Sequence, residues 1–199
     1  LQVVAGECLA AISLAVSHIV SGISATTSSH NSLYSRAKKA LEIMEREHLY
    51  DVAYRLVTSA SSYSLDPTRN TPQARLREAS GLTLLALSSC SSVSSSYLIS
   101  NKAMSGLITI AAELLDAPSA LRGEWASRGL CYFECASQLI LQSYQSNDES
   151  CLSLLLGALD AGAVGLANKY MKDKVHLRNH DKAYRQMRIK MAACYMLAA

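Results

Sequence analysis

The sequence predicts an all-α protein of about eight helices joined by short corners. Only three prolines and nine glycines occur in 199 residues, so few positions would interrupt a helix. Apolar residues recur at the three- and four-residue spacing of helices. β-Branched residues do not cluster in alternating runs, so no strand is expected. We expect one helical-repeat domain over residues 1–199, as an excerpt of a longer chain, because the sequence starts without Met and stops inside an apolar helical pattern.

The first predicted helix spans residues 1–20 and is apolar over much of its circumference. Val4, Cys8 and Ala15 lie beside the main apolar stripe, so the helix is expected to be covered on more than one side. The stripe itself consists of Leu1, Ala5, Leu9, Ile12, Val16 and Ile19. The Ser/Thr/Gly-rich residues 21–32 are predicted to form a loop.

Amphipathic helices are expected at 33–48 and at about 50–61. The second of these helices is expected to end before Pro67, because two prolines this close together, Pro67 and Pro72, cannot continue a helix. Thr71 is the predicted cap of the next helix, with Pro72 in its first turn.

The helix after that cap is expected to span 73–90. The serine-rich "SSVSSS" is predicted to interrupt it before a helix at 97–116. "DAPSA" predicts a tight corner.

The second half of the chain predicts three more helices. A long helix at 119–143 is apolar nearly all round, which is typical of the middle of a stack. A loop at "QSNDES" precedes a helix at about 150–171. A charged loop at 172–180 and a helix at 181–199 follow.

A similar helical pattern recurs along the chain, with Ala at one position and an apolar or small residue four positions later. The pairs are Ala5 with Leu9, Ala79 with Thr83, Ala126 with Leu130 and Ala193 with Leu197. The separation from Ala79 to Ala126 fits a helical repeat of about 40–47 residues. The other two separations are longer, so they imply loop insertions.

The stretch "LQVVAGECLAAISLA" and the recurring Arg-x-x-Ala-x-x-x-Leu pattern resemble the last helix of armadillo and HEAT repeats. The resemblance covers four of about eight helices. The Gly-Gly turn typical of armadillo repeats is missing, so a HEAT-like arrangement fits equally well. The resemblance implies an irregular α-solenoid that acts as a protein-binding scaffold.

No catalytic motif is found, and the chain is expected not to be an enzyme. "GALDAGAVG", residues 157–165, lacks the spacing and the preceding strand of a dinucleotide-binding loop. Cys131, Cys135, His176 and His180 form two i,i+4 pairs that could supply four zinc ligands. Core packing of the cysteines is the favoured interpretation, so no metal or cofactor is predicted.

Positive charge is concentrated in residues 169–190, with eight Lys or Arg against Asp173 and Asp181. The segment is interpreted first as a solvated connection, second as a docking surface for an acidic protein segment, and third as a site for anionic lipid or nucleic acid. The candidate partner-binding residues are Arg75, Arg77, Arg122, Arg128, Lys172, Lys174, Arg178, Arg185 and Arg188.

The predicted function is a non-enzymatic protein–protein interaction scaffold or adaptor within a larger assembly. The alternative is a helical domain that binds nucleic acid or anionic lipid through 169–190. The six cysteines are scattered through apolar helical patterns, which favours reduced, buried thiols. No signal peptide or transmembrane run is recognised, so an intracellular location, cytoplasmic or nuclear, is expected.

Overall fold

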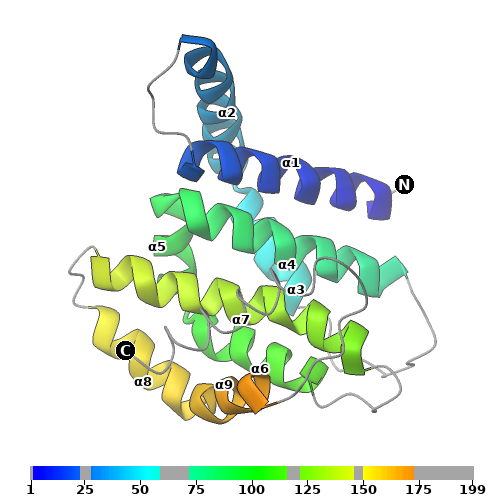
Figure 1. The fold of residues 1–199 in the computed structure, drawn as a ribbon, viewed down its shortest axis with the longest axis vertical. Coiled ribbons are helices and arrows are strands. Elements are labelled where there is room, and N and C mark those ends of the chain that lie inside the picture. Colours follow the sequence, from blue (N-terminus) through cyan, green and yellow to red (C-terminus); the bar gives the residue numbers. More distant parts are fainter. Residues whose placement is uncertain (1, 23–27, 59–71, 116–121, 146–149, 173–199) are drawn as a thin grey trace. The chain divides into compact units, whose positions relative to one another are not determined.

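The structure, a computed structural model, describes residues 2–22, 28–58, 72–115, 122–145 and 150–172 (Figure 1). Within these ranges every residue is helical or lies in a connection of one or two residues, so the all-α prediction is confirmed. The helices are α1 (Gln2–Gly22), α2 (Ser28–Arg46), α3 (Leu49–Thr58), α4 (Pro72–Cys90), α5 (Ser92–Ser100), α6 (Ala103–Leu115), α7 (Arg122–Gln145), α8 (Ser150–Asp160) and α9 (Ala163–Lys172).

Two serine-rich segments are more helical than the sequence predicts. The expected loop at 21–32 is wrong for its last residues, because α2 already begins at Ser28. The expected interruption at "SSVSSS" is confirmed at Ser91 but is shorter than expected, because α5 already begins at Ser92. Helices α4 and α5 meet there at a bend of 115°.

Two helices that were predicted to be continuous are each divided. The predicted helix at 97–116 is broken between α5 and α6, where Lys102 has a φ of 52°. The predicted helix at 150–171 is broken between α8 and α9, where Gly162 has a φ of 81°. A positive φ ends a helix because the chain leaves the right-handed region at that residue. The predicted loop at 172–180 and helix at 181–199 lie outside the described residues, except Lys172.

The first compact unit consists of α1 to α4 and the start of α5, up to Tyr97. Helices α1 and α4 form its most extensive contact and run side by side in the same direction (Figure 1). The direction follows from the pairs along them: Glu7 meets Arg75 near both starts, and Ser17 meets Ser89 near both ends.

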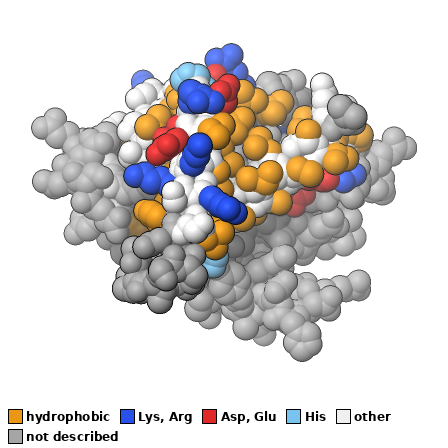
Figure 2. Space-filling view, turned by 90° about the horizontal axis from the view of Figure 1, so that it is seen from above, with side chains coloured by type: hydrophobic (Ala, Val, Ile, Leu, Met, Phe, Trp, Pro, Cys, Tyr) orange, Lys and Arg blue, Asp and Glu red, His pale blue; other side chains and the backbone are white. Residues whose placement is uncertain are grey.

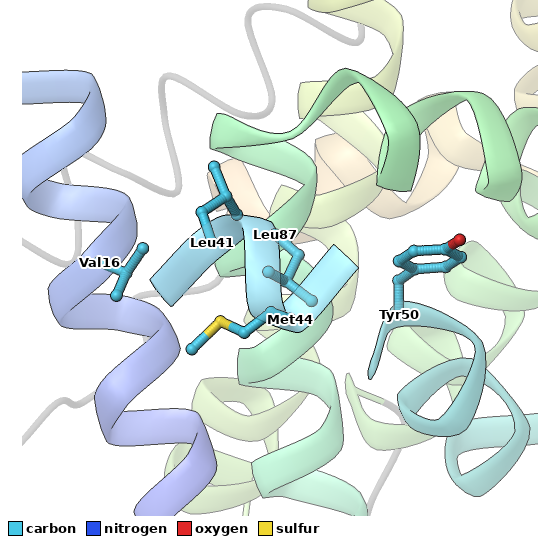
Figure 3. Packing of buried hydrophobic residues seen from close by; sticks show 5 residues of the cluster. All are labelled: Val16, Leu41, Met44, Tyr50 and Leu87. Atoms are coloured by element: carbon cyan, nitrogen blue, oxygen red, sulfur yellow. The ribbon is translucent and has the colours of Figure 1, made fainter. Parts of the chain in front are cut away.

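The core of this unit lies where α2 and α3 meet α1 and α4. Figure 3 shows its central residues, and the side chains are contributed by all four helices. They are Val16, Leu41, Met44, Tyr50 and Leu87. Burial of such apolar side chains from four helices stabilises the unit, since each fully buried Leu or Met contributes about 1.5–3 kcal/mol.

The second compact unit contains α6 to α9 and the end of α5. Helices α6 and α7 pack most extensively, and α8 contacts both. Residues 131–137 of α7 are all buried, as are Leu139 and Ile140. The expectation that this helix is covered on all sides is confirmed for that stretch.

Candidate interaction surfaces

Helix α1 is packed on one side and bare on the other. Ala10, Ser13 and Val16 are buried, whereas residues one or two positions away are exposed. The prediction that this helix is covered on more than one side is therefore wrong for the described residues. The reason is that the neighbours of α1 in its unit, α2 and α4, reach only its inner side.

The inner side of α1 holds α4 through close and polar contacts. A Cβ at Gly6 would lie 2.7 Å from Leu76 Cδ1, so the absence of a side chain permits the close approach. The guanidinium of Arg75 donates to Glu7 from Nε and from Nη2, both at 2.7 Å. These contacts fix which side of α1 faces inward.

We define the outer face of α1 as its exposed apolar side chains. They are Val4, Ala5, Cys8, Ala11, Ile12, Leu14 and Ala15. Figure 2 shows apolar side chains gathered along α1 on this face of the molecule. Contiguous exposed apolar surface of this kind marks an interaction site more often than scattered single residues do.

Helix α2 adds positive charge beside that surface. Arg36, Lys38 and Lys39 are exposed, against the exposed acid Glu42. Figure 2 shows Lys and Arg side chains at the end of the apolar area where α2 lies. The other described acid of α2, Glu45, accepts a hydrogen bond of 2.6 Å from the Ser91 hydroxyl.

The second unit carries an exposed apolar stripe on α8, which we name the α8 stripe. Leu152, Leu156 and Leu159 follow helical spacing and are 67%, 52% and 54% exposed. The opposite side of α8 is buried through Leu154 and Ala158. Each unit therefore presents one bare apolar helix side.

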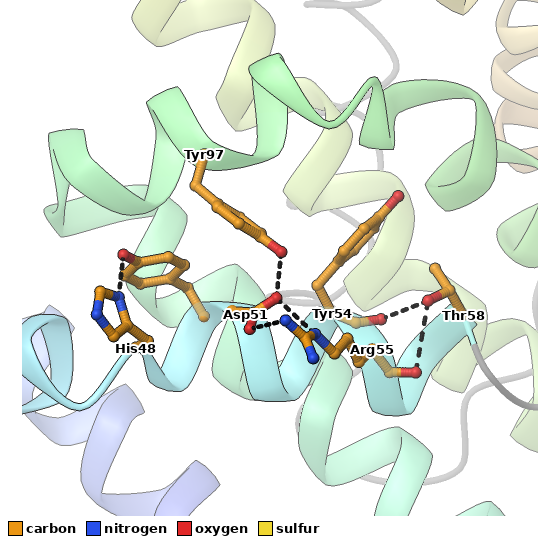
Figure 4. A network of polar contacts seen from close by, with 7 residues as sticks. His48, Asp51, Tyr54, Arg55, Thr58 and Tyr97 are labelled. Atoms are coloured by element: carbon orange, nitrogen blue, oxygen red, sulfur yellow. Dashed lines mark hydrogen bonds and ion pairs between the residues drawn. The ribbon is translucent and has the colours of Figure 1, made fainter.

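A polar network joins α3 to α5 in the first unit (Figure 4). The Asp51 carboxylate accepts hydrogen bonds from the Tyr97 hydroxyl and from Arg55 Nε, the latter at 2.9 Å. These bonds, that from Tyr97 first, lower the pKa of Asp51, and the bond to Asp51 raises the pKa of Tyr97. Because Asp51 and Arg55 lie on α3 and Tyr97 lies on α5, the bond from Tyr97 to Asp51 joins the two helices.

Ser91 explains how the serine-rich bend is built. Its hydroxyl accepts the backbone N–H of Ser94 at 3.0 Å, which caps the start of α5, and donates to Glu45. Ser95 donates from its hydroxyl to the carbonyls of Ser88 and Ser91. Serine at these positions satisfies backbone groups that the bend would leave unpaired.

The structure describes two of the predicted partner-binding arginines, of which Arg75 keeps 42% of its side chain exposed and Arg77 is buried. Arg75 is engaged by Glu7, and Arg77 is only 6% exposed and takes part in further polar interactions. The side chains of Arg122, Arg128 and Lys172 lie outside the described part, as do residues Lys174, Arg178, Arg185 and Arg188. The outer face of α1 was missed as a surface, although the all-round apolar pattern of residues 1–20 was its signal.

The described cysteines differ in burial, from exposed Cys8 to fully buried Cys135. Cys131 and Cys135 are buried on α7, and His176 and His180 lie outside the described residues. Burial raises the pKa of Cys90 to about 11, so its thiol is protonated at neutral pH. No group of three or more metal-ligating side chains occurs within the described ranges.

One described helix, α1, is long and apolar enough to cross a membrane, and the bent pair of α4 and α5 meets the same test only if taken together. A mostly buried core helix and a signal sequence pass the same test, and 22% of this stretch of α1 is buried. Comparisons with protein-family models, with curated proteins and with solved structures find no match.

Proposed function

We propose that this chain is a non-enzymatic, intracellular interaction scaffold, built as an irregular α-solenoid and acting within a larger assembly. The observation that carries the proposal is the outer face of α1. An apolar helix side that the chain leaves bare costs solubility unless another molecule covers it. The α8 stripe supplies a second such side in the other unit.

The packing of α1 on α4 supports the solenoid part of the proposal. Both helices carry the recurring Ala pattern, and they lie side by side in the same direction with α2 and α3 between them in sequence. In solenoids, equivalent helices of successive repeats stack in this way, and each repeat buries its apolar side against the next.

The alternative, binding of nucleic acid or anionic lipid through 169–190, has little described structure to support it. Only residues 169–172 of that segment belong to α9, and Lys169 is the one basic residue among them whose exposure is described. The scaffold therefore remains the function that the described geometry favours.

The test compares partner binding by the full-length protein and two matched surface variants, Ile12→Glu on α1 and Leu156→Glu on α8. Both residues are 52% exposed, so neither change should disturb the fold. Proteins that co-purify with wild type are then tested as purified components. We expect at least one to bind wild type directly and to bind one of the variants about tenfold or more weakly.

Retention of every direct partner by both variants, with unchanged affinity, would contradict the scaffold proposal. Circular dichroism and thermal unfolding of the two variants serve as the control. They should match wild type, because substitutions at exposed positions usually change stability by no more than about 0.5 kcal/mol.

A further inference from the structure

Resting on the proposed function, we propose that the outer face of α1 binds an amphipathic helix of a partner protein whose apolar stripe is flanked by acidic residues. This assigns a partner chemistry to the surface. Three observations carry it: the spacing of the exposed residues, their small size, and the charge beside them.

The spacing of the exposed residues fits a helical partner. Ala5, Cys8, Ile12 and Ala15 recur alternately every three and four residues along the bare side of α1. This is the seam that two packed helices share, since it keeps successive side chains facing the same neighbour. From Ala5 to Ala15 the seam can run beside a partner helix for about 15 Å, at a rise of about 1.5 Å per residue.

The size of these residues favours a helix over a lipid surface. The small Ala5, Ala11 and Ala15 share this face with the larger Val4 and Ile12, so a second backbone can approach closely at the alanines. Helices that lie in a membrane surface instead carry Trp, Phe and Leu on their apolar side. Helix α1 has no aromatic residue.

The positive charge beside the outer face of α1 favours a partner helix with acidic residues along the edge of its apolar stripe. Three exposed basic side chains of α2, Arg36, Lys38 and Lys39, outnumber its exposed acid, Glu42. On α1 itself the acid Glu7 is already paired with Arg75 on the inner side. A partner with Glu or Asp along the edge that lies near α2 gains attraction, whereas a basic partner is repelled.

The experiment uses two fluorescein-labelled synthetic helices of about three heptads each, with the same Leu/Ala stripe. One has Glu on its flanks and the other has Lys. Fluorescence anisotropy measures their binding to the full-length protein. We expect the Glu peptide to bind about tenfold or more tightly than the Lys peptide, and to weaken as salt rises.

Two variants locate the binding, and a third is the matched control. Ile12→Asp should weaken the Glu peptide about tenfold, because it places a charge in the seam. The double variant Arg36→Glu, Lys39→Glu should reverse the preference between the two peptides, which a purely structural effect would not do. Leu152→Asp, at a more exposed position in the other unit (67% against 52% for Ile12), should leave the affinity for the Glu peptide unchanged.

Three results would overturn the proposal: equal binding of both peptides, Ile12-dependent self-association in sedimentation without peptide binding, or Ile12-dependent binding to phosphatidylserine vesicles without peptide binding. These results can be distinguished from results that would contradict the scaffold proposal itself. If the Glu peptide does not bind while a natural partner still depends on Leu156 of the α8 stripe, the scaffold stands and only the assignment of α1 falls.

Discussion

At Gly6 the side chain is absent because a neighbouring helix occupies its place. We expect Gly6→Val to lower the free energy of unfolding by about 1 kcal/mol, because the Leu76 Cδ1 methyl, at the end of a flexible side chain, must move aside for the added atoms. Denaturant titration of wild type and variant measures this change. Gly106 in α6 has open space around it, so Gly106→Ala should instead raise stability by about 0.5–1 kcal/mol. A loss of stability at position 106 equal to that at position 6 would contradict the packing described for α1.

Ser91 is the second residue on which local structure depends. We expect Ser91→Ala to lower the free energy of unfolding by about 0.5–2 kcal/mol, because the cap of α5 and the bond to Glu45 are both lost. Ser92→Ala is the control. Ser92 is exposed and its change should stay within about 0.5 kcal/mol in the same titration. Equal effects of the two substitutions would rule out the capping role.

Gly6 and Ser91 also show why the sequence alone does not predict the role of a single residue. Glycines at helix–helix contacts and serines at the starts of helices are common in any helical protein. What distinguishes Gly6 and Ser91 is the neighbour each one meets, Leu76 in one case and Glu45 in the other. Those neighbours are distant in sequence, so no local pattern predicts them.

The junction of α3 with α5 makes stability depend on pH. Hydrogen bonds from Tyr97 and Arg55 hold the pKa of Asp51 below its usual range in the folded state. A lowered pKa means that the carboxylate stabilises the fold above its unfolded pKa, and that this contribution is lost as pH falls through the folded pKa. Stability should therefore fall on acidification below about pH 4 partly through Asp51.

Thermal unfolding from pH 6 down to pH 2 in wild type and in Asp51→Asn measures this dependence. We expect a shallower acid loss in the variant, because its amide does not titrate in this range. Tyr97→Phe removes the hydrogen bond that contributes most to the lowered pKa of Asp51. The stability of this variant should therefore also fall less steeply with acidification than that of wild type. Identical pH profiles for the three proteins would contradict the network in Figure 4.

At the scale of the helices, the sequence predicts which segments are helical better than it predicts where each helix begins and ends. The long apolar pattern of residues 1–20 and the capped start at Pro72 correspond closely to α1 and α4. The break at Lys102 could not be foreseen, because lysine is a good helix former and adopts a positive φ there. The break at Gly162 had a visible signal, since glycine readily takes the left-handed conformation that ends a helix.

At the scale of the whole molecule, the sequence predicts the all-α class. Which side of each helix packs against its neighbours is known only from the structure. The apolar pattern of α1 does not reveal which of its sides faces α4. That choice depends on Gly6, on the pair of Glu7 with Arg75, and on the bond of Ser17 with Ser89. The interaction site was therefore predicted at the arginines, whereas the described structure points to apolar helix sides.

The account depends most on one claim, that α1 has a packed inner side and a bare outer side. Alkylation of the purified, partner-free protein under native conditions, followed by mass spectrometry of each cysteine, tests it directly. Cys8 is exposed on the outer face and should react as fast as in the unfolded chain, whereas the half-buried Cys90, with its pKa raised to about 11, should react much more slowly in the folded protein than after unfolding. Equal protection of Cys8 and Cys90 would show that another part of the chain covers the outer face, and the claim would be wrong.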